Sequence, residues 1–108
     1  MKKIELIKGI FSPKERIEYA EGSIVSQQIV KNQVGNITLF SFDKDQQLSE
    51  HSAPFDAVIQ VLEGEAEVHI ETQQYTLTEG QMIIMPANIP HAVYALNRLK
   101  MMLIMIKG

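Results

Sequence analysis

Two histidines are the side chains of this 108-residue sequence best suited to chemistry. His51 opens the stretch HSAPFDAVIQVLEG, and His91 lies in the stretch GQMIIMPANIPHAVYA. An imidazole gains or loses a proton near neutral pH, and in its neutral form it is a common metal ligand. The pair therefore indicates a metal site, an acid–base site or a polar anchor for a ligand. Which of these three applies depends on how the secondary-structure elements position the two residues.

The composition excludes several other kinds of chemistry. The sequence has no cysteine, so disulfides, thiolate zinc sites and thiol nucleophiles are ruled out. A net charge of −3 and scattered lysines argue against a nucleic-acid partner. No apolar run is long enough for a signal peptide or a membrane span. We therefore expect a cytoplasmic protein whose partner is neither a nucleic acid nor a membrane.

Two-residue alternation of apolar and polar side chains dominates the chain and predicts eight or nine short strands. The predicted strands are residues 23–31, 36–43, 48–52, 55–63, 65–71, 75–78, 81–86, 91–96 and 99–107. The exception is 12–20, where Ser12 as a cap and Pro13 at the first helical position predict a turn or two of helix. We expect one all-β domain over residues 1–108, with 1–22 as an N-terminal extension.

Residues 51–64 resemble the first motif of the cupin superfamily, His-x-His-x(3–4)-Glu-x(6)-Gly. His51 matches the first histidine and Gly64 matches the glycine. Ala53 stands where the motif has its second histidine, and Ala57 stands where it has glutamate. The resemblance therefore comes with two of the usual metal ligands replaced.

The stretch that contains His91 resembles the second cupin motif, Gly-x(5)-Pro-x-Gly-x(2)-His-x(3)-Asn. Gly80, Pro86 and His91 match it, whereas Asn88 replaces the second glycine and Ala95 replaces the asparagine. Asparagine tolerates a positive φ, so the change at position 88 preserves the backbone requirement. The resemblance implies an antiparallel jelly-roll barrel of the RmlC-like type, a double-stranded β-helix, with the two histidines facing each other inside it.

Strand periodicity indicates which side chains accompany the histidines. His51 and Ala53 are two residues apart and would share one face of a strand. Beyond the bend at Pro54, the same inward face would continue through Ala57 and Ile59. The predicted ligand-binding residues are His51, Ala53, Ala57, Ile59, His91 and Val93.

The expected cofactor content follows from the number of metal ligands. A cupin metal site normally combines three histidines with one glutamate, and this sequence supplies two histidines. Divalent transition metals need three or four protein ligands for tight binding. Glu50, Asp56 and Gln60 are out of phase with the inward face. We therefore expect no tightly bound cofactor. A weak site at His51 and His91 for nickel, manganese, iron or zinc is the alternative.

Four functions fit these residues, and the leading one is binding of a small molecule in an apolar barrel pocket. His51 and His91 would be its polar anchors. The main alternative is a metal-dependent enzyme of the dioxygenase or isomerase type, in which substrate or water completes a two-histidine site. Metal-free acid–base catalysis and an interaction module with a vestigial pocket are the other two. Whether the chain is an enzyme stays open, because one fold hosts all four classes.

The last predicted strand suggests how the molecule assembles. Its stretch MMLIMI (101–106) is apolar at odd and even positions alike. Such a strand is either buried on both faces or covered on one face by a second subunit. We expect a homodimer, because a single small sandwich has few elements with which to cover this surface.

We expect His69 and Tyr94 to be surface residues.

Overall fold

The computed structural model describes residues 9–107. Regular structure in this part of the chain consists of one short helix and nine strands. In chain order these are α1 (Pro13–Arg16), β1 (Ile24–Asn32), β2 (Gly35–Phe42), β3 (Gln47–His51), β4 (Asp56–Glu63), β5 (Ala66–Ile70), β6 (Gln73–Leu77), β7 (Met82–Met85), β8 (His91–Ala95) and β9 (Leu99–Ile106). The all-β prediction is confirmed, and each strand overlaps the range that alternation predicted.

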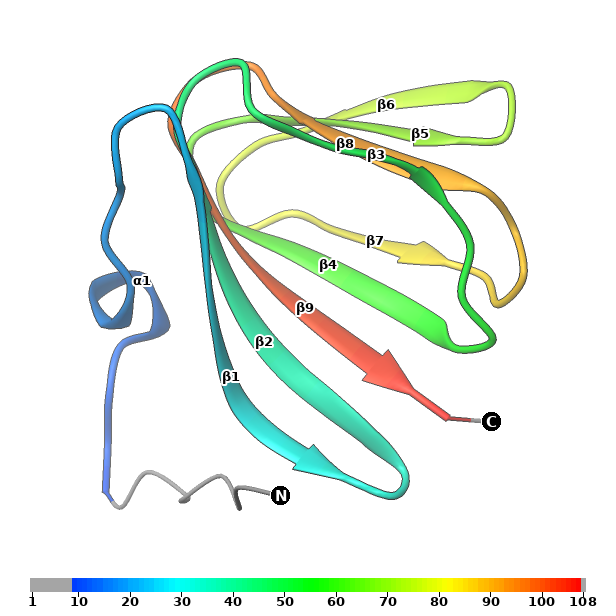
Figure 1. Ribbon diagram of the computed structural model, residues 1–108, viewed down its shortest axis with the longest axis horizontal. Coiled ribbons are helices and arrows are strands. Elements are labelled where there is room, and N and C mark those ends of the chain that lie inside the picture. Colours follow the sequence, from blue (N-terminus) through cyan, green and yellow to red (C-terminus); the bar gives the residue numbers. More distant parts are fainter. Residues whose placement is uncertain (1–8, 108) are drawn as a thin grey trace.

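The strands form two sheets that face each other (Figure 1). Sheet A has the order β1-β2-β9-β4-β7, and sheet B has the order β3-β8-β5-β6. All pairings in both sheets are antiparallel. The chain crosses from one sheet to the other between β3 and β4, between β4 and β5, and at every connection after β6. The fold is therefore the jelly roll that the two motifs imply.

The loops next to His51 and His91 lie at one end of the barrel. The β3–β4, β5–β6 and β7–β8 loops all lie on the right of Figure 1, and we call this the loop end. β3 finishes there with His51, and β8 starts there with His91. The topology therefore brings two residues that are far apart in sequence to the same end of sheet B.

The main core lies between the two sheets. Ala57, Ile59 and Val61 on β4 are 1%, 0% and 0% exposed, which confirms the inward face predicted for this strand. Val68 and Val93 face them from sheet B and belong to the same cluster. Alternation along β4 thus places every second side chain in the core, as a half-buried strand requires.

Gly64 closes the turn between β4 and β5 with a φ of +84°. A Cβ atom at this position would lie 2.0 Å from the carbonyl oxygen of Arg98. The turn therefore needs glycine for two reasons, the left-handed backbone and the close approach of a neighbouring chain segment.

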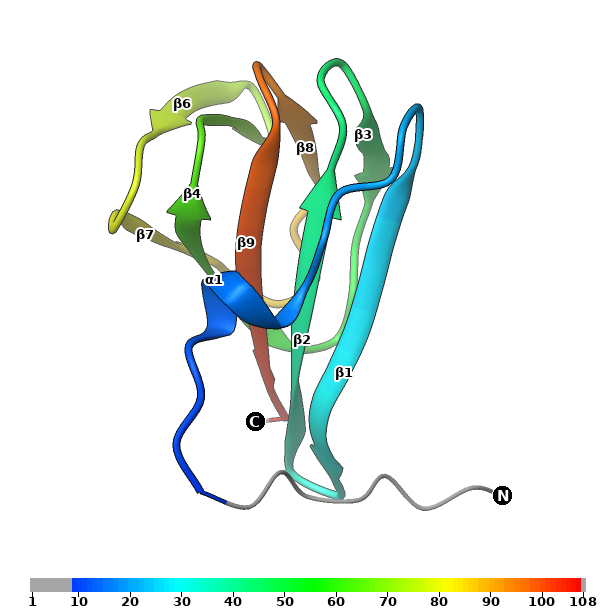
Figure 2. The same ribbon diagram turned by 90° about the vertical axis from the view of Figure 1, so that its left-hand side faces the viewer.

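The N-terminal extension covers part of the outer face of sheet A (Figure 2). Ile17 is buried there with Ile29 and Leu39, and Phe11 packs against this second cluster. The predicted helical turn is present as α1, with Pro13 in its first turn. Ser12 occupies the cap position, but its side chain makes no capping hydrogen bond, so that detail of the prediction is wrong. No helix among residues 9–107 is long and apolar enough to cross a membrane.

Tyr19 fastens the end of the extension to sheet A. Its hydroxyl donates a hydrogen bond to Oε2 of Glu63 at 2.5 Å. The Arg98 guanidinium and the Lys100 ammonium each lie 5.1 Å from the centre of its ring. Burial and the hydrogen bond to the carboxylate raise the pKa of Tyr19 well above its usual value, so the phenol stays protonated.

The outer face of sheet B is polar, in contrast to that of sheet A. His69 lies there with its side chain 44% exposed, and its Nε2 is 3.5 Å from a carboxylate oxygen of Glu67. On the same face, the Tyr94 hydroxyl donates to Oδ1 of Asp45 at 2.6 Å. The surface positions predicted for His69 and Tyr94 are confirmed.

Candidate functional site

His51 and His91 are cross-strand neighbours at the loop end. Their Cα atoms pair in the antiparallel ladder between β3 and β8. The centres of the two rings are 4.4 Å apart, and the ring planes meet at 67°, in an edge-on arrangement. The structure thus brings together the two residues that the sequence singled out.

The two imidazoles differ in burial but share one kind of backbone contact. His91 is 4% exposed, whereas His51 is exposed at the rim. Nδ1 of His51 lies 2.7 Å from the carbonyl oxygen of Ser49, and Nδ1 of His91 lies 3.1 Å from that of Ile89. A carbonyl only accepts hydrogen bonds, so in each neutral ring the proton is on Nδ1. Each Nε2 is left with a lone pair for a ligand.

Burial lowers the pKa of His91 below its ordinary value. The hydrogen bond to Ile89 works in the opposite direction, and the neighbouring imidazole of His51 lowers the pKa further. The net result is a ring that is neutral at physiological pH. His91 therefore presents Nε2 as a hydrogen-bond acceptor and not as a cation.

Ala53 lies two residues beyond the end of β3, in the β3–β4 loop, so it does not share a strand face with His51. Its carbonyl oxygen accepts a hydrogen bond from the backbone N–H of Asn88 at 2.7 Å. Asn88 has a φ of +65°, the left-handed conformation that the motif's glycine provides. The Asp56 carboxylate holds the same β7–β8 loop by accepting from the Ala87 N–H at 2.9 Å. These contacts position the loop that leads into His91.

Ala57, the position of the motif's glutamate, lies in an apolar row across sheet A. Its ladder partners are Met85 on β7 and Met105 on β9. Ala57 and Met85 are each 1% exposed. Methionine is flexible and fills irregular space well. This row is therefore packed with apolar side chains at the place where the motif has a charged glutamate.

Ile59 and Val93, the other two predicted binding residues, are 0% and 2% exposed and belong to the main core. Four open pockets on the described part of the chain have volumes of 190 to 510 Å³. None of these four is lined by His51, Ala57 or His91. The ligand cavity predicted beside the imidazoles therefore stays a prediction.

The donor set at the loop end does not fit a tightly held metal ion. In the part of the chain that the structure describes, no three His, Cys, Asp or Glu side chains are grouped closely enough to hold one. Asp56 is occupied with the β7–β8 loop, and position 57 is an alanine. Two neutral imidazoles fall short of the three or four ligands that a divalent transition metal requires, and they do not offset its charge.

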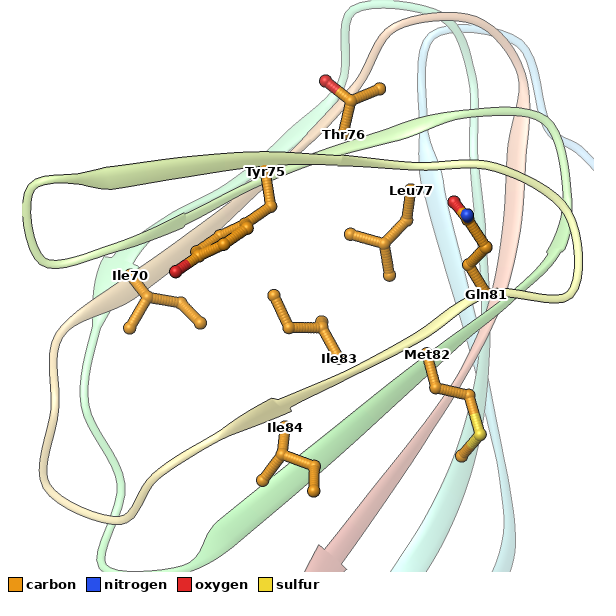
Figure 3. A pocket seen from close by; sticks show the side chains of 8 residues that line it. All are labelled: Ile70, Tyr75, Thr76, Leu77, Gln81, Met82, Ile83 and Ile84. Carbon is orange, nitrogen blue, oxygen red and sulfur yellow. The ribbon is translucent and has the colours of Figure 1, made fainter.

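An open groove of about 510 Å³ lies between the edge strands β6 and β7, and the sequence did not predict it (Figure 3). Ile70, Tyr75 and Leu77 face into it from sheet B, and Ile83 faces them from sheet A. Alternation in QQYTL places Tyr75 and Leu77 on one face of β6, so the signal was present. The gap itself arises because β6 and β7 are the last strands of different sheets and do not pair.

Comparisons with known proteins agree with this fold. Residues 38–107 match the family model described as "Cupin domain". An uncharacterised protein of Aquifex aeolicus is 30% identical over 90 residues, which cover 76% of this chain and 74% of that protein. A crystal structure of a conserved Streptococcus pyogenes protein of unknown function has a TM-score of 0.91 and 36% identity, covering 100% of this chain and 96% of the other. A cupin superfamily protein from Desulfitobacterium hafniense has a TM-score of 0.90 and 26% identity, and both chains are covered completely.

Proposed function

This chain belongs to the cupin family, and from that premise we propose that it binds a small molecule at the loop end of its barrel. His51 and His91 are the polar anchors. The observation that carries the proposal is the shared backbone contact of the two rings, since each Nδ1 is held by a carbonyl. Two Nε2 lone pairs, one on a largely buried ring and one on a ring at the rim, are thereby offered to a ligand.

The burial of His91 argues for a use of its imidazole. An imidazole at 4% exposure loses most of its hydration, and an aliphatic side chain would pack at the same place without that loss. The ring is orientated by the Ile89 carbonyl, as rings in binding sites commonly are by a backbone acceptor. These features favour a working site over a vestigial one.

A metal-dependent enzyme of the dioxygenase or isomerase type is the alternative function. It is supported by the same pair of Nε2 atoms, with substrate or water as the remaining ligands. It is weakened by the apolar row Met105–Ala57–Met85, which stands where a carboxylate would be needed. We therefore rank small-molecule binding without a resident metal above it.

A ligand screen with three matched histidine variants tests the proposal. Small acids, sugars, alcohols and aromatic compounds are screened by thermal shift against the wild type, and each hit is repeated on His51→Leu and His91→Leu. His69→Leu is the control, because His69 lies on the outer face of sheet B. We expect hits whose stabilisation is lost in the His91 variant, reduced in the His51 variant and kept in the control.

Two results would contradict the proposal. One is a set of hits that stabilise all three variants as much as the wild type. The other is stoichiometric nickel, manganese, iron or zinc in elemental analysis of protein purified without chelator, which would place the metal-dependent enzyme first.

A further inference from the structure

An apolar pocket lies between the N-terminal extension and the outer face of sheet A. Its volume is about 250 Å³, and all seven residues that line it are apolar. Phe11 and Pro13 of the extension form its roof, and side chains of β1, β2 and β9 form its floor. Figure 2 shows the extension crossing this face of the sheet. Sheet A therefore separates this pocket from the histidine pair, which lies on sheet B at the loop end.

A β-bulge in β1 supplies part of the floor. The ladder between β1 and β2 shifts register between Gln28 and Val30, so Ile29 has no ladder partner on β2. Regular alternation would send Ile29 and Val30 to opposite faces of the sheet, but both line the pocket. Bulges commonly re-aim a side chain next to a functional site. The local backbone of β1 thus gives this pocket two consecutive aliphatic residues.

Hydrogen bonds hold the extension against the sheet next to the roof. Nζ of Lys100 donates to the carbonyl oxygen of Lys14 at 2.7 Å. The Ser41 hydroxyl donates to the carbonyl oxygen of Glu18, also at 2.7 Å. Pro13 directly precedes Lys14, and its ring fixes its own φ. The pocket is therefore formed in advance, and a ligand does not bear the entropic cost of ordering the extension.

The volume and the lining define the part of a ligand that fits inside. An apolar cavity of about 150 Å³ is large enough for benzene, so about 250 Å³ has room for roughly ten carbon atoms. A charged group inside the pocket would lose its hydration without gaining a partner, because no charged side chain lines it. The enclosed part of a ligand must accordingly be a hydrocarbon chain or ring.

Arg16 places a positive charge beside the roof. Its guanidinium carbon lies 5.9 Å from the centre of the Phe11 ring, which itself lines the pocket. Arg16 is exposed, and within residues 9–107 no carboxylate forms an ion pair with it. A guanidinium forms its strongest hydrogen bonds with carboxylates and phosphates. The charge beside the roof is therefore complementary to an acidic group at the end of an apolar tail.

We propose that this pocket binds the tail of a carboxylic acid of about eight carbons, whose carboxylate meets Arg16 beside Phe11. An alcohol with the same tail fits the pocket but lacks the attraction to Arg16, and an ammonium is repelled by it. The proposal concerns a second site and does not depend on the function proposed for the loop end.

Octanoate, octan-1-ol and octylammonium test the head group on the full chain. Binding is measured by calorimetric titration and located by NMR, through the methyl signals of Ile29, Ile37 and Met102. Octanoate should bind about two- to fivefold more tightly than octanol, the effect of one exposed ion pair, and octylammonium should bind most weakly. Arg16→Gln should abolish the difference between octanoate and octanol, whereas Arg16→Lys should keep most of it.

Three variants test the pocket itself. Val30→Phe fills it, and Val34→Phe is the matched control, because Val34 is 67% exposed and does not line this pocket. Phe11→Ala removes part of the roof and leaves every strand unchanged. Val30→Phe and Phe11→Ala should each weaken octanoate binding by about tenfold or more, since each takes apolar contact from the tail. Val34→Phe should bind octanoate as the wild type does, and so should His91→Leu.

Four results would overturn the proposal. The first is that the wild type binds no octanoate at millimolar concentration, and the second is that Val30→Phe and Phe11→Ala bind it as tightly as the wild type. The third is equal affinity for octanoate and octylammonium, which would remove the acid from the ligand class. The fourth is a light-scattering mass that falls as octanoate binds, which would show that a second copy of the chain occupies the pocket.

This proposal and the proposed function fail separately. Octanoate binding that is lost in His91→Leu but kept in Val30→Phe would place the acid at the loop end, which overturns the second site and supports the first. A screening compound whose stabilisation is lost in Val30→Phe but kept in His91→Leu belongs to the pocket under the extension and does not count against the loop-end site.

Discussion

The backbone N–H of Asn88 donates a hydrogen bond to the carbonyl oxygen of Ala53 at 2.7 Å, and this contact joins the two loops that flank the histidine pair. Asn88 has a φ of +65°. Asparagine adopts this left-handed conformation more readily than most residues, and glycine adopts it without strain. The contact between the loops therefore depends on which residue occupies position 88.

Asn88→Val should destabilise the protein by about 1–2 kcal/mol, because a β-branched residue is strained at positive φ. Asn88→Gly should leave the free energy of unfolding within about 1 kcal/mol of wild type, because glycine relieves strain but loses more entropy on folding. Urea denaturation of both variants measures this. Equal stabilities would show that the β7–β8 loop is not held in the left-handed conformation.

The lowered pKa of His91 predicts a pH dependence of stability. Burial makes the native pKa lower than the unfolded one, so below about pH 6.5 the unfolded chain binds more protons than the native protein. Stability that is present above the unfolded pKa is therefore lost as the pH falls toward the native pKa. His91→Leu removes this contribution and should lose less stability than the wild type on going from about pH 7.5 to about pH 5.5.

Urea denaturation at both pH values checks the prediction, with His69→Leu as the matched control. The control should follow the wild type, since His69 lies on the outer face of sheet B, away from His91. Identical pH dependence in the wild type and His91→Leu would mean that burial does not hold the His91 ring in its neutral form.

Restoring the two absent ligands should create a metal site. Ala53→His together with Ala57→Glu should bind nickel or manganese far more tightly than either single variant, because ligands around one ion act as a unit. The carboxylate introduced at position 57 should destabilise the metal-free variant, since this position lies between Met85 and Met105. Calorimetric titration of the wild type and the three variants measures the affinities. A double variant no better than the wild type would mean that positions 53 and 57 do not converge on His51 and His91.

The outer face of sheet A predicts a homodimer. Ile84 and Ile106 are 65% and 52% exposed on this face. Ile104 on β9 and Val58 on β4, which are ladder partners, add further apolar side chains to it. An antiparallel sheet normally keeps a solvated face polar, as sheet B does, so this apolar face is suited to a second copy of the chain. Light scattering at micromolar concentration should give the mass of a dimer.

Ile84→Lys combined with Ile106→Lys should shift that dimer to a monomer, because two buried charges would face each other across the interface. Gln74→Lys on the outer face of sheet B is the control and should remain dimeric. A monomeric mass for the wild type that does not change on concentration would contradict the prediction.

Alternation in the sequence predicts which side chains of a single strand point inward. It does not predict how two segments of the chain lie relative to each other. The inward positions of Ala57 and Ile59 on β4 follow from the sequence, because a period of two is a local property. The same rule predicts that Ala53 shares the face of His51, but β3 ends at His51 and the rule does not apply in the loop. The groove beside Tyr75 does not follow from one strand's pattern, because it exists only where β6 and β7 end different sheets.

The resemblance in the two motifs predicted the fold and the meeting of His51 with His91, and both are present in the structure. It could not indicate which ring would be buried. That difference arises from position in sheet B, since β3 is an edge strand and β8 lies between β3 and β5. His91 is enclosed on both sides, whereas His51 is left at the rim.

The most direct test of the account is the state of the histidine ring nitrogens with and without ligand. Long-range ¹H–¹⁵N NMR spectra of the wild type at neutral pH report the proton position in each ring. Without ligand, His51 and His91 should both be protonated on Nδ1, and adding a compound that stabilises the protein should move the Nε2 signal of His91 toward that of a hydrogen-bonded acceptor. A His91 ring protonated on Nε2, or an Nε2 signal that no stabilising compound moves, would contradict the account.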